Sequence, residues 1–142
     1  MTVAEKLVLQ YHVEGGDLSL AGEASSKMKM TLRRLGLAPD VIRKASICMY
    51  EGEINMVIHA NGGEVTVEVG MDEIDLVLAD QGPGIADVDQ AMEEGYSTAG
   101  EEARDLGFGA GMGLPNMKRY SDEMSVESTV GVGTTVRMKI RI

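Results

Sequence analysis

The stretch EGEIN, residues 51–55, lies inside a long segment with helical periodicity and is followed by His59. A spacing of four residues places Glu51, Asn55 and His59 on one face of the predicted helix. A carboxylate and a carboxamide one turn apart can orient a nucleophile and offer an oxygen ligand to Mg²⁺. The same spacing also occurs on ordinary solvated helix faces. The motifs in the rest of the chain are therefore needed to distinguish a functional site from a solvated face.

Two further residues of this stretch carry expectations of their own. Gly52 costs about 1 kcal/mol relative to alanine inside a helix, which predicts a close approach by another element or by a ligand. Glu53 follows Glu51 by two residues and points to the opposite side of the helix. We therefore expect Glu53 to be independent of the chemistry at Glu51.

A second motif, DQGPGI at residues 80–85, comes directly after an apolar segment with strand character. Asp80 would lie where the strand ends, and its carboxylate could accept a hydrogen bond from an amino group such as that of adenine. Gly82 and Gly84 would let the backbone pass against a flat ring. The plain alternative is a strand that ends in a Gly-Pro turn.

A third motif, GFGAGMGL at residues 107–114, has glycines at alternate positions and opens a predicted helix. Such a loop exposes backbone amides and leads to the positive end of the helix dipole. It is neither a dinucleotide fingerprint nor a P-loop, because no strand directly precedes it and no Lys-Ser/Thr pair follows it. A flexible hinge is the alternative.

A fourth motif, Gly133-Thr134-Thr135, begins the last predicted strand. The Thr134 hydroxyl could donate a hydrogen bond to a carboxylate such as Asp80. Preference of threonine for strands would explain the motif equally well.

The periodicity of the chain predicts one domain, residues 1–142, with strands and helices in the order β-α-α-β-β-α-β-β. This order predicts an α/β (α+β) two-layer sandwich with helices on one face of a mixed, mostly antiparallel sheet. Residues 87–108 show no clear period beyond a short helical piece near 88–94, which predicts a lid or binding loop. The other predicted elements are strands 7–13, 65–69 and 74–79, helices 21–35, 39–60 and 112–120, and a hairpin of 124–130 with 134–142.

Composition limits the function. Thirteen Lys and Arg against 23 Asp and Glu give a net charge of -10, which argues against a nucleic-acid surface. Phosphates would have to be met by a metal ion, backbone amides and a helix N-terminus. The apolar runs are shorter than the roughly 20 residues of a membrane span, and residues 1–6 show no signal peptide. We therefore expect a soluble, cytoplasmic protein.

The single cysteine, Cys48, has no partner for an internal disulfide, which also suits the cytoplasm. It could act as a nucleophile or redox sensor, or it could be a small buried apolar residue of a helix.

The four motifs, in this order, resemble those of the Bergerat-fold (GHKL) ATPases over residues of about 38–142. The resemblance implies that ATP or ADP binds together with Mg²⁺. It implies that Asn55 is the metal ligand, that Asp80 binds the adenine amino group and that Glu51 is the catalytic base. The nucleotide-binding residues that it implies are Asn55, Asp80, Gly82, Gly84, Ile85, Ser97, Thr98, Arg104, Gly109, Gly111, Met112, Gly113, Leu114 and Thr134.

The assignments of Arg104 and of the pair Ser97-Thr98 rest on separate observations. Arg104 is the one arginine between Gln81 and Gly107, but it lies seven residues before Gly111. The pair at positions 97 and 98 would either contact phosphate or form a polar turn.

From a length of 142 residues we expect the chain to lack the extra domains of larger Bergerat-fold proteins. The motif ExxxNxxxH and the stretches at 92–98 and 111–115 resemble the small bacterial anti-sigma-factor serine kinases and the switch kinase of a stress-signalling complex. This resemblance implies a serine/threonine protein kinase that phosphorylates a STAS-domain anti-sigma antagonist. It names a sigma factor, a phosphatase or a second copy of the chain as further partners.

The alternative function is a nucleotide-gated binding module. Such a module would sequester a sigma factor or activate a phosphatase without transferring phosphate.

Overall fold

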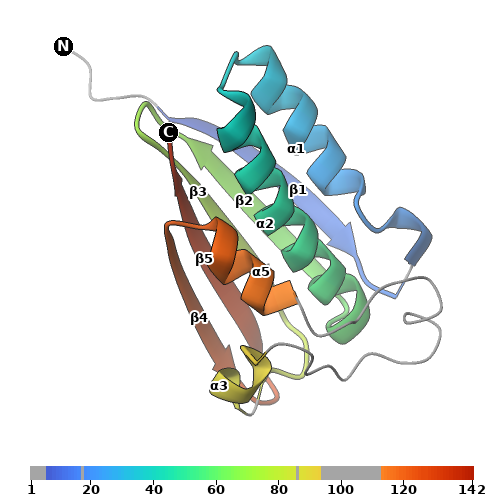
Figure 1. Cartoon of the computed structure of the whole chain (residues 1–142). Helices are drawn as coiled ribbons and strands as arrows, with labels where there is room; N and C mark the ends of the chain where they lie inside the picture. The colour runs from blue at the N-terminus through green and yellow to red at the C-terminus, as the bar shows by residue number, and fades with distance from the viewer. Residues whose placement is uncertain (1–5, 17, 86, 94–112) are drawn as a thin grey trace.

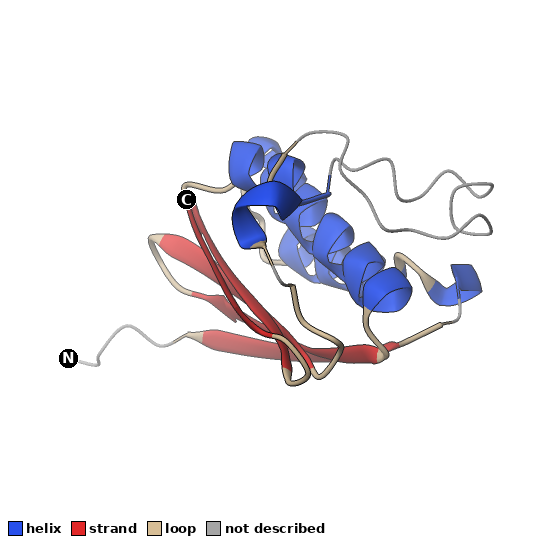
Figure 2. Ribbon diagram, turned by 90° about the horizontal axis from the view of Figure 1, so that it is seen from below, coloured by secondary structure: helices blue, strands red, loops and turns tan. Residues whose placement is uncertain are grey.

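The structure, a computed structural model, describes residues 6–16, 18–85, 87–93 and 113–142 (Figure 1). These residues form two layers, a sheet and a set of helices that lie on one of its faces (Figure 2). The elements are β1 (Leu7–Glu14), the 3₁₀ turn η1 (Leu18–Leu20), α1 (Glu23–Arg34), α2 (Pro39–His59), β2 (Gly62–Val69), β3 (Glu73–Asp80), α3 (Val88–Ala91), α5 (Gly113–Tyr120), β4 (Glu123–Thr129) and β5 (Gly133–Arg141).

The sheet has five strands in the order β1-β2-β3-β5-β4, and every described pairing is antiparallel. The predicted fold class is confirmed. Predicted boundaries differ from the observed ones by a few residues: β2 begins at Gly62 rather than at residue 65, and α1 begins at Glu23 rather than near residue 21. Gly22 has a φ of 95°, a left-handed conformation that cannot continue a right-handed helix, so α1 begins after it.

The core lies between the sheet and the helices. Alternate residues of β2 and β3 point toward the helices, and Val65, Val67, Ile74 and Leu76 are at most 1% exposed. Cys48 of α2 is also fully buried in this layer. Burial raises the pKa of its thiol to about 12, which makes it a packing residue rather than a nucleophile.

Helix α2 lies close to the sheet because it carries a glycine where it crosses β3. A Cβ built on Gly52 would lie 2.4 Å from Cδ2 of Leu78. The helix-breaking residue therefore permits close packing between two elements, as the sequence predicts. This contact fixes the segment that carries Glu51 and Asn55 at a short distance above β3.

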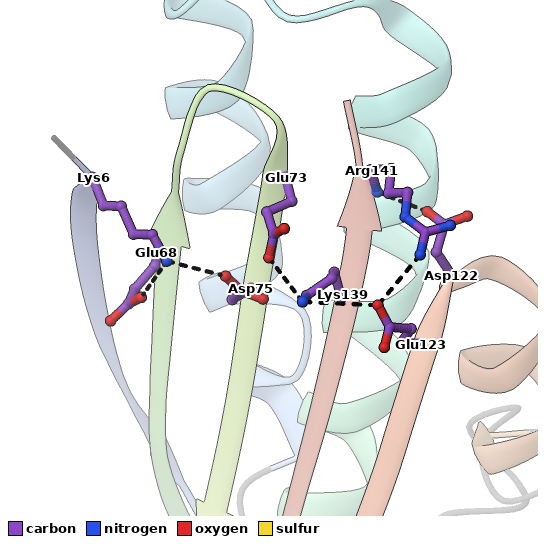
Figure 3. Close-up of polar contacts among 8 residues, drawn as sticks. All are labelled: Lys6, Glu68, Glu73, Asp75, Asp122, Glu123, Lys139 and Arg141. Atoms are coloured by element: carbon purple, nitrogen blue, oxygen red, sulfur yellow. Dashed lines mark hydrogen bonds and ion pairs between the residues drawn. The ribbon is translucent and has the colours of Figure 1, made fainter. Parts of the chain in front are cut away.

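The opposite face of the sheet carries charged side chains (Figure 3). Lys6 lies between Glu68 and Asp75, at 3.6 Å from a carboxylate oxygen of each. Lys139 of β5 contacts Glu73 of β3 at 3.1 Å. Exposed ion pairs of this kind each contribute at most about 1 kcal/mol, so they mark a face in contact with water.

None of the helices in the described part of the chain has both the length and the apolar character that crossing a membrane requires.

Candidate functional site

Asp80 lies at the end of β3 and is oriented by backbone amides. Its Oδ1 atom accepts hydrogen bonds from the N–H of Gly82 at 2.9 Å and from the N–H of Thr134 at 3.1 Å. No described residue donates a hydrogen bond to its other oxygen, Oδ2. One carboxylate oxygen is therefore fixed, and the other can accept a hydrogen bond from a ligand.

Thr134 meets Asp80 through its backbone, whereas its hydroxyl has a different partner. The Thr134 and Ser128 hydroxyl oxygens are 2.8 Å apart, and the Ser128 hydroxyl also accepts the N–H of Ile85 at 2.7 Å. The expected hydroxyl bond from Thr134 to Asp80 was wrong, because the amide occupies that position. Ser128 was missed, although the β4–β5 register pairs it with Thr134 and the predicted hairpin could have revealed it.

The two glycines after Asp80 pack against the chain itself. A Cβ on Gly82 would lie 2.6 Å from Cβ of Ala60, the residue that follows α2. Gly84 has a φ of 81°, and a Cβ there would lie 2.5 Å from the carbonyl oxygen of Thr129. Both glycines thus let the loop pack closely against α2 and the β4–β5 hairpin. The contact of this loop with a flat ring stays a prediction.

Asn55 lies on α2 one turn after Glu51, and both side chains are partly exposed. Gly113, the first residue of α5, lies so near that a Cβ on it would be 3.1 Å from both Oδ1 and Nδ2 of Asn55. The beginning of a helix, where backbone N–H groups lack partners within the helix, therefore lies beside this carboxamide. The two motifs that carry Asn55 and Gly113 are brought together.

The donor set fits a loosely held hard cation. Among the described residues there is no group of three or more His, Cys, Asp or Glu side chains that could hold a metal. Mg²⁺ in nucleotide sites commonly uses one or two protein oxygens and completes its shell with phosphates and water. The side-chain oxygen of Asn55 can serve as such a ligand.

Glu51 lines an open groove between α1, α2 and α5 with a volume of about 790 Å³. Its Oε2 atom accepts a hydrogen bond of 2.7 Å from Nδ2 of Asn116, the fourth residue of α5. Lys29 from α1 and Tyr50 from α2 also line the groove. The sequence motifs did not include Asn116, since its contact depends on how α5 is rotated against α2.

Glu53 points away from Glu51, as expected, and it has a structural role of its own. It is 2% exposed, and its carboxylate accepts the backbone N–H groups of Gly22, Ala24 and Ser25 at 2.9–3.2 Å. The Ser25 hydroxyl donates a further hydrogen bond of 2.6 Å. Glu53 therefore caps the N-terminus of α1, a structural role that the sequence did not reveal.

The remaining predicted residues fall into two groups. Leu114 is buried in the core, Ile85 packs against its edge, and His59 is half-buried at the end of α2. Most of the predicted lid, residues 87–108, and the glycines before Gly113 lie outside the described residues. Within the described part of the lid, Val88–Ala91 form α3. The predicted site residues outside the described ranges are Ser97, Thr98, Arg104, Gly109, Gly111 and Met112.

Comparison with known proteins agrees with this arrangement. Residues 17–140 match the family described as histidine kinase-like ATPase domain. The serine/threonine-protein kinase RsbT of Bacillus subtilis is 37% identical over 87 residues, which cover 58% of this chain and 59% of that protein. The anti-sigma F factor of Thermoanaerobacter sp. (strain X514) is 38% identical over 92 residues, covering 63% and 54%.

Another relative aligns over a longer stretch. The anti-sigma F factor of Priestia megaterium is 33% identical over 107 residues, which cover 70% of this chain and 69% of the relative. The match to RsbT spans 59% of its length, and the match to the Thermoanaerobacter protein spans 54%. The fold, the site geometry and the matched residues together show that the chain belongs to the histidine kinase-like ATPase domain family.

Proposed function

We propose that this protein is an ATP- and Mg²⁺-dependent serine/threonine protein kinase that regulates a sigma factor or a stress response. Its substrate would be a small STAS-domain anti-sigma antagonist, and a sigma factor or phosphatase would be a further partner. The names of the relatives, a serine/threonine kinase and anti-sigma F factors, support this direction. The proposal includes a cytoplasmic location.

One observation carries the proposal: Glu51 opens to a groove of about 790 Å³ while Asn55 lies one turn further along the same helix. A protein hydroxyl that enters the groove can reach the carboxylate. A nucleotide whose adenine is bound by Asp80 would direct its phosphates toward Asn55. The groove and the nucleotide site would thus adjoin on the face of α2 that carries Glu51 and Asn55.

The reaction is a transfer of the terminal phosphoryl group of ATP to a serine or threonine hydroxyl. The new P–O bond forms as the bond to ADP breaks, and Glu51 accepts the hydroxyl proton. Bound through Asn55, Mg²⁺ would supply charge neutralisation at the phosphates. Asp80 would hold the adenine amino group with its free oxygen.

The second candidate is a nucleotide-gated binding module. A groove beside a nucleotide site could hold a partner without phosphorylating it. Glu51 favours catalysis, because a carboxylate held beside the groove does little for nucleotide affinity. Measured phosphate transfer decides between the two candidates.

The test uses purified chain, labelled ATP with Mg²⁺ and a STAS-domain protein from the same genome. We expect wild type to phosphorylate a serine or threonine of that protein, as mass spectrometry would show. A positioned base contributes about 10²–10⁴-fold, so Glu51→Gln should lose transfer by that order while still binding ATP.

Glu127→Gln is the matched control, since Glu127 is an exposed carboxylate of β4. Equal transfer by wild type and Glu51→Gln would remove Glu51 as the base. Nucleotide-dependent binding of the STAS protein without any transfer by wild type would establish the binding module instead.

A further inference from the structure

The carboxylate of Glu51 has one oxygen fixed and one left open. Nδ2 of Asn116 donates to Oε2 at 2.7 Å, a short distance typical of a hydrogen bond to a charged acceptor. Oε1 accepts no hydrogen bond from any residue in the described ranges, and Glu51 lines the groove. The contact therefore leaves a single oxygen available to an incoming hydroxyl.

The position of Asn116 is itself fixed by its neighbours on α5. Leu114 and Met117 are 7% and 0% exposed and anchor the helix in the core. The Met117 carbonyl also accepts the Cys48 thiol at 3.7 Å. Since Cys48 precedes Glu51 by three residues on α2, two adjacent contacts hold α5 at one rotation against α2, and this rotation directs Asn116 at the carboxylate.

We propose that Asn116 is a positioning residue for phosphate transfer, which holds Glu51 by its amide so that Oε1 faces the acceptor hydroxyl. This inference rests on the proposed function, in which Glu51 is the base. The amide is suited to this task, because its N–H group donates a hydrogen bond but does not titrate and so cannot compete for the proton. A base fixed in the productive orientation avoids the cost of ordering it during each turnover.

The role differs from a contribution to packing. Asn116 is partly exposed and lines the groove, so the core of α5 is formed without it. It contacts neither Asn55 nor Asp80 by a hydrogen bond in the described structure. Loss of its amide should therefore reduce the turnover number and leave the KM for ATP unchanged.

An isosteric variant gives a sharp test. Aspartate in place of Asn116 can donate a hydrogen bond to the Glu51 carboxylate only when the aspartate itself carries a proton; when both carboxyl groups are ionised they repel each other. Other groups that could alter this pH dependence lie on all three surrounding helices. They are Glu23 and Lys29 of α1, Cys48, Tyr50 and Glu53 of α2 and Tyr120 of α5.

The experiment measures phosphate transfer from ATP with Mg²⁺ to the same STAS-domain protein between pH 5.5 and 8.5, relative to wild type at each pH. Asn116→Leu should lower the turnover number by about tenfold to a hundredfold at every pH. Asn116→Asp should fall as far at high pH and recover toward wild type at low pH. Asn61→Leu, the same change at an exposed residue after α2, is the control.

Thermal unfolding of each variant separates a positioning role from a folding defect. A turnover number for Asn116→Leu equal to that of wild type would overturn the role of Asn116 and leave the kinase function intact. A loss in Asn116→Asp that does not vary with pH would also overturn it. Undiminished transfer by Glu51→Gln would instead overturn the proposed base, and this inference with it.

Discussion

Asp80 is held by the backbone at the end of a central strand. The amides of Gly82 and Thr134 both donate to Oδ1; Gly82 lies in the loop that follows β3, and Thr134 lies at the start of the neighbouring strand β5. A carboxylate that accepts two amides keeps its orientation without a charged partner. We propose that the remaining oxygen accepts a hydrogen bond from the adenine amino group.

Asp80→Asn tests this assignment. The amide of asparagine would place an N–H group toward the adenine amino group, so ATP and ADP should both bind more weakly by about 1–3 kcal/mol. Isothermal titration calorimetry measures the change. Asp72→Asn, in the exposed β2–β3 turn, should bind nucleotide as wild type does, and unchanged affinity in Asp80→Asn would remove Asp80 from the adenine site.

The two histidines should titrate on opposite sides of the ordinary value of about 6.5. The hydrogen bond that the His12 ring donates to the Glu64 carboxylate raises the pKa of this exposed histidine, whereas burial lowers the pKa of His59. His12 therefore adds stability below about pH 6.5 that is lost as the pH rises through its folded value. His59 adds stability above that pH that is lost as the pH falls.

Proton NMR of the two imidazole rings measures both values directly. His12→Gln and His59→Gln assign the resonances. Glu64→Gln should move the His12 midpoint down and leave His59 in place. A common midpoint for the two rings would contradict the environments that the structure gives them.

At the scale of elements, Glu53 joins α1 to α2. The N-cap residue of α1 is Gly22, which has no side chain to cap the helix. The carboxylate of Glu53, from another helix, takes its place by accepting three amides and a hydroxyl at the N-terminus of α1. A buried negative charge at this end also interacts favourably with the helix dipole.

Glu53→Gln should therefore destabilise the fold by about 3 kcal/mol, the range for losing charge-assisted hydrogen bonds in a buried site. Urea denaturation followed by circular dichroism would measure the free energy of unfolding. Glu127→Gln changes the same group at an exposed position of β4 and should alter it by less than about 0.5 kcal/mol. A loss of similar size in the two variants would show that Glu53 is not a structural cap.

The elements that local patterns describe well were predicted, and the contacts between them were not. Helix α2 follows from its periodicity and from Pro39 at its first turn, and the β4–β5 hairpin follows from strict alternation. The role of Glu53 depends on α1 lying beside α2, which no local pattern specifies. Gly52 is intermediate, because its cost predicted a close neighbour but not that the neighbour is Leu78.

At the scale of the molecule, the fold gathers distant motifs at one end of the sheet. Asp80 meets Thr134 through the β3–β5 pairing, Gly82 meets Ala60 at the end of α2, and Asn55 meets Gly113. The order of the motifs in the sequence led us to predict that they form one nucleotide-binding site. Asn116 and Ser128 complete the contacts, but their positions follow from helix rotation and strand register, which motif spacing does not encode.

The charge of the whole chain sets a condition on nucleotide binding. A net charge of -10 repels a polyphosphate, and basic residues are scarce around Asn55 and Asp80 in sequence. We therefore expect neutralisation to come largely from Mg²⁺, whose one protein ligand on α2 would be Asn55. Affinity for ATP should then depend on the metal through this one side chain.

Asn55→Ala should accordingly abolish the gain in ATP affinity that Mg²⁺ gives. For wild type we expect Mg²⁺ to strengthen binding by about tenfold or more over EDTA, a difference of at least about 1.4 kcal/mol. For Asn55→Ala the two conditions should give the same, weak affinity, close to that of wild type in EDTA. Asn61→Ala, the same change at an exposed position, should keep the full gain. Equal affinity of wild type in Mg²⁺ and in EDTA would show that backbone amides at the start of α5 suffice for the phosphates, and Asn55 would then lose its place as the metal ligand.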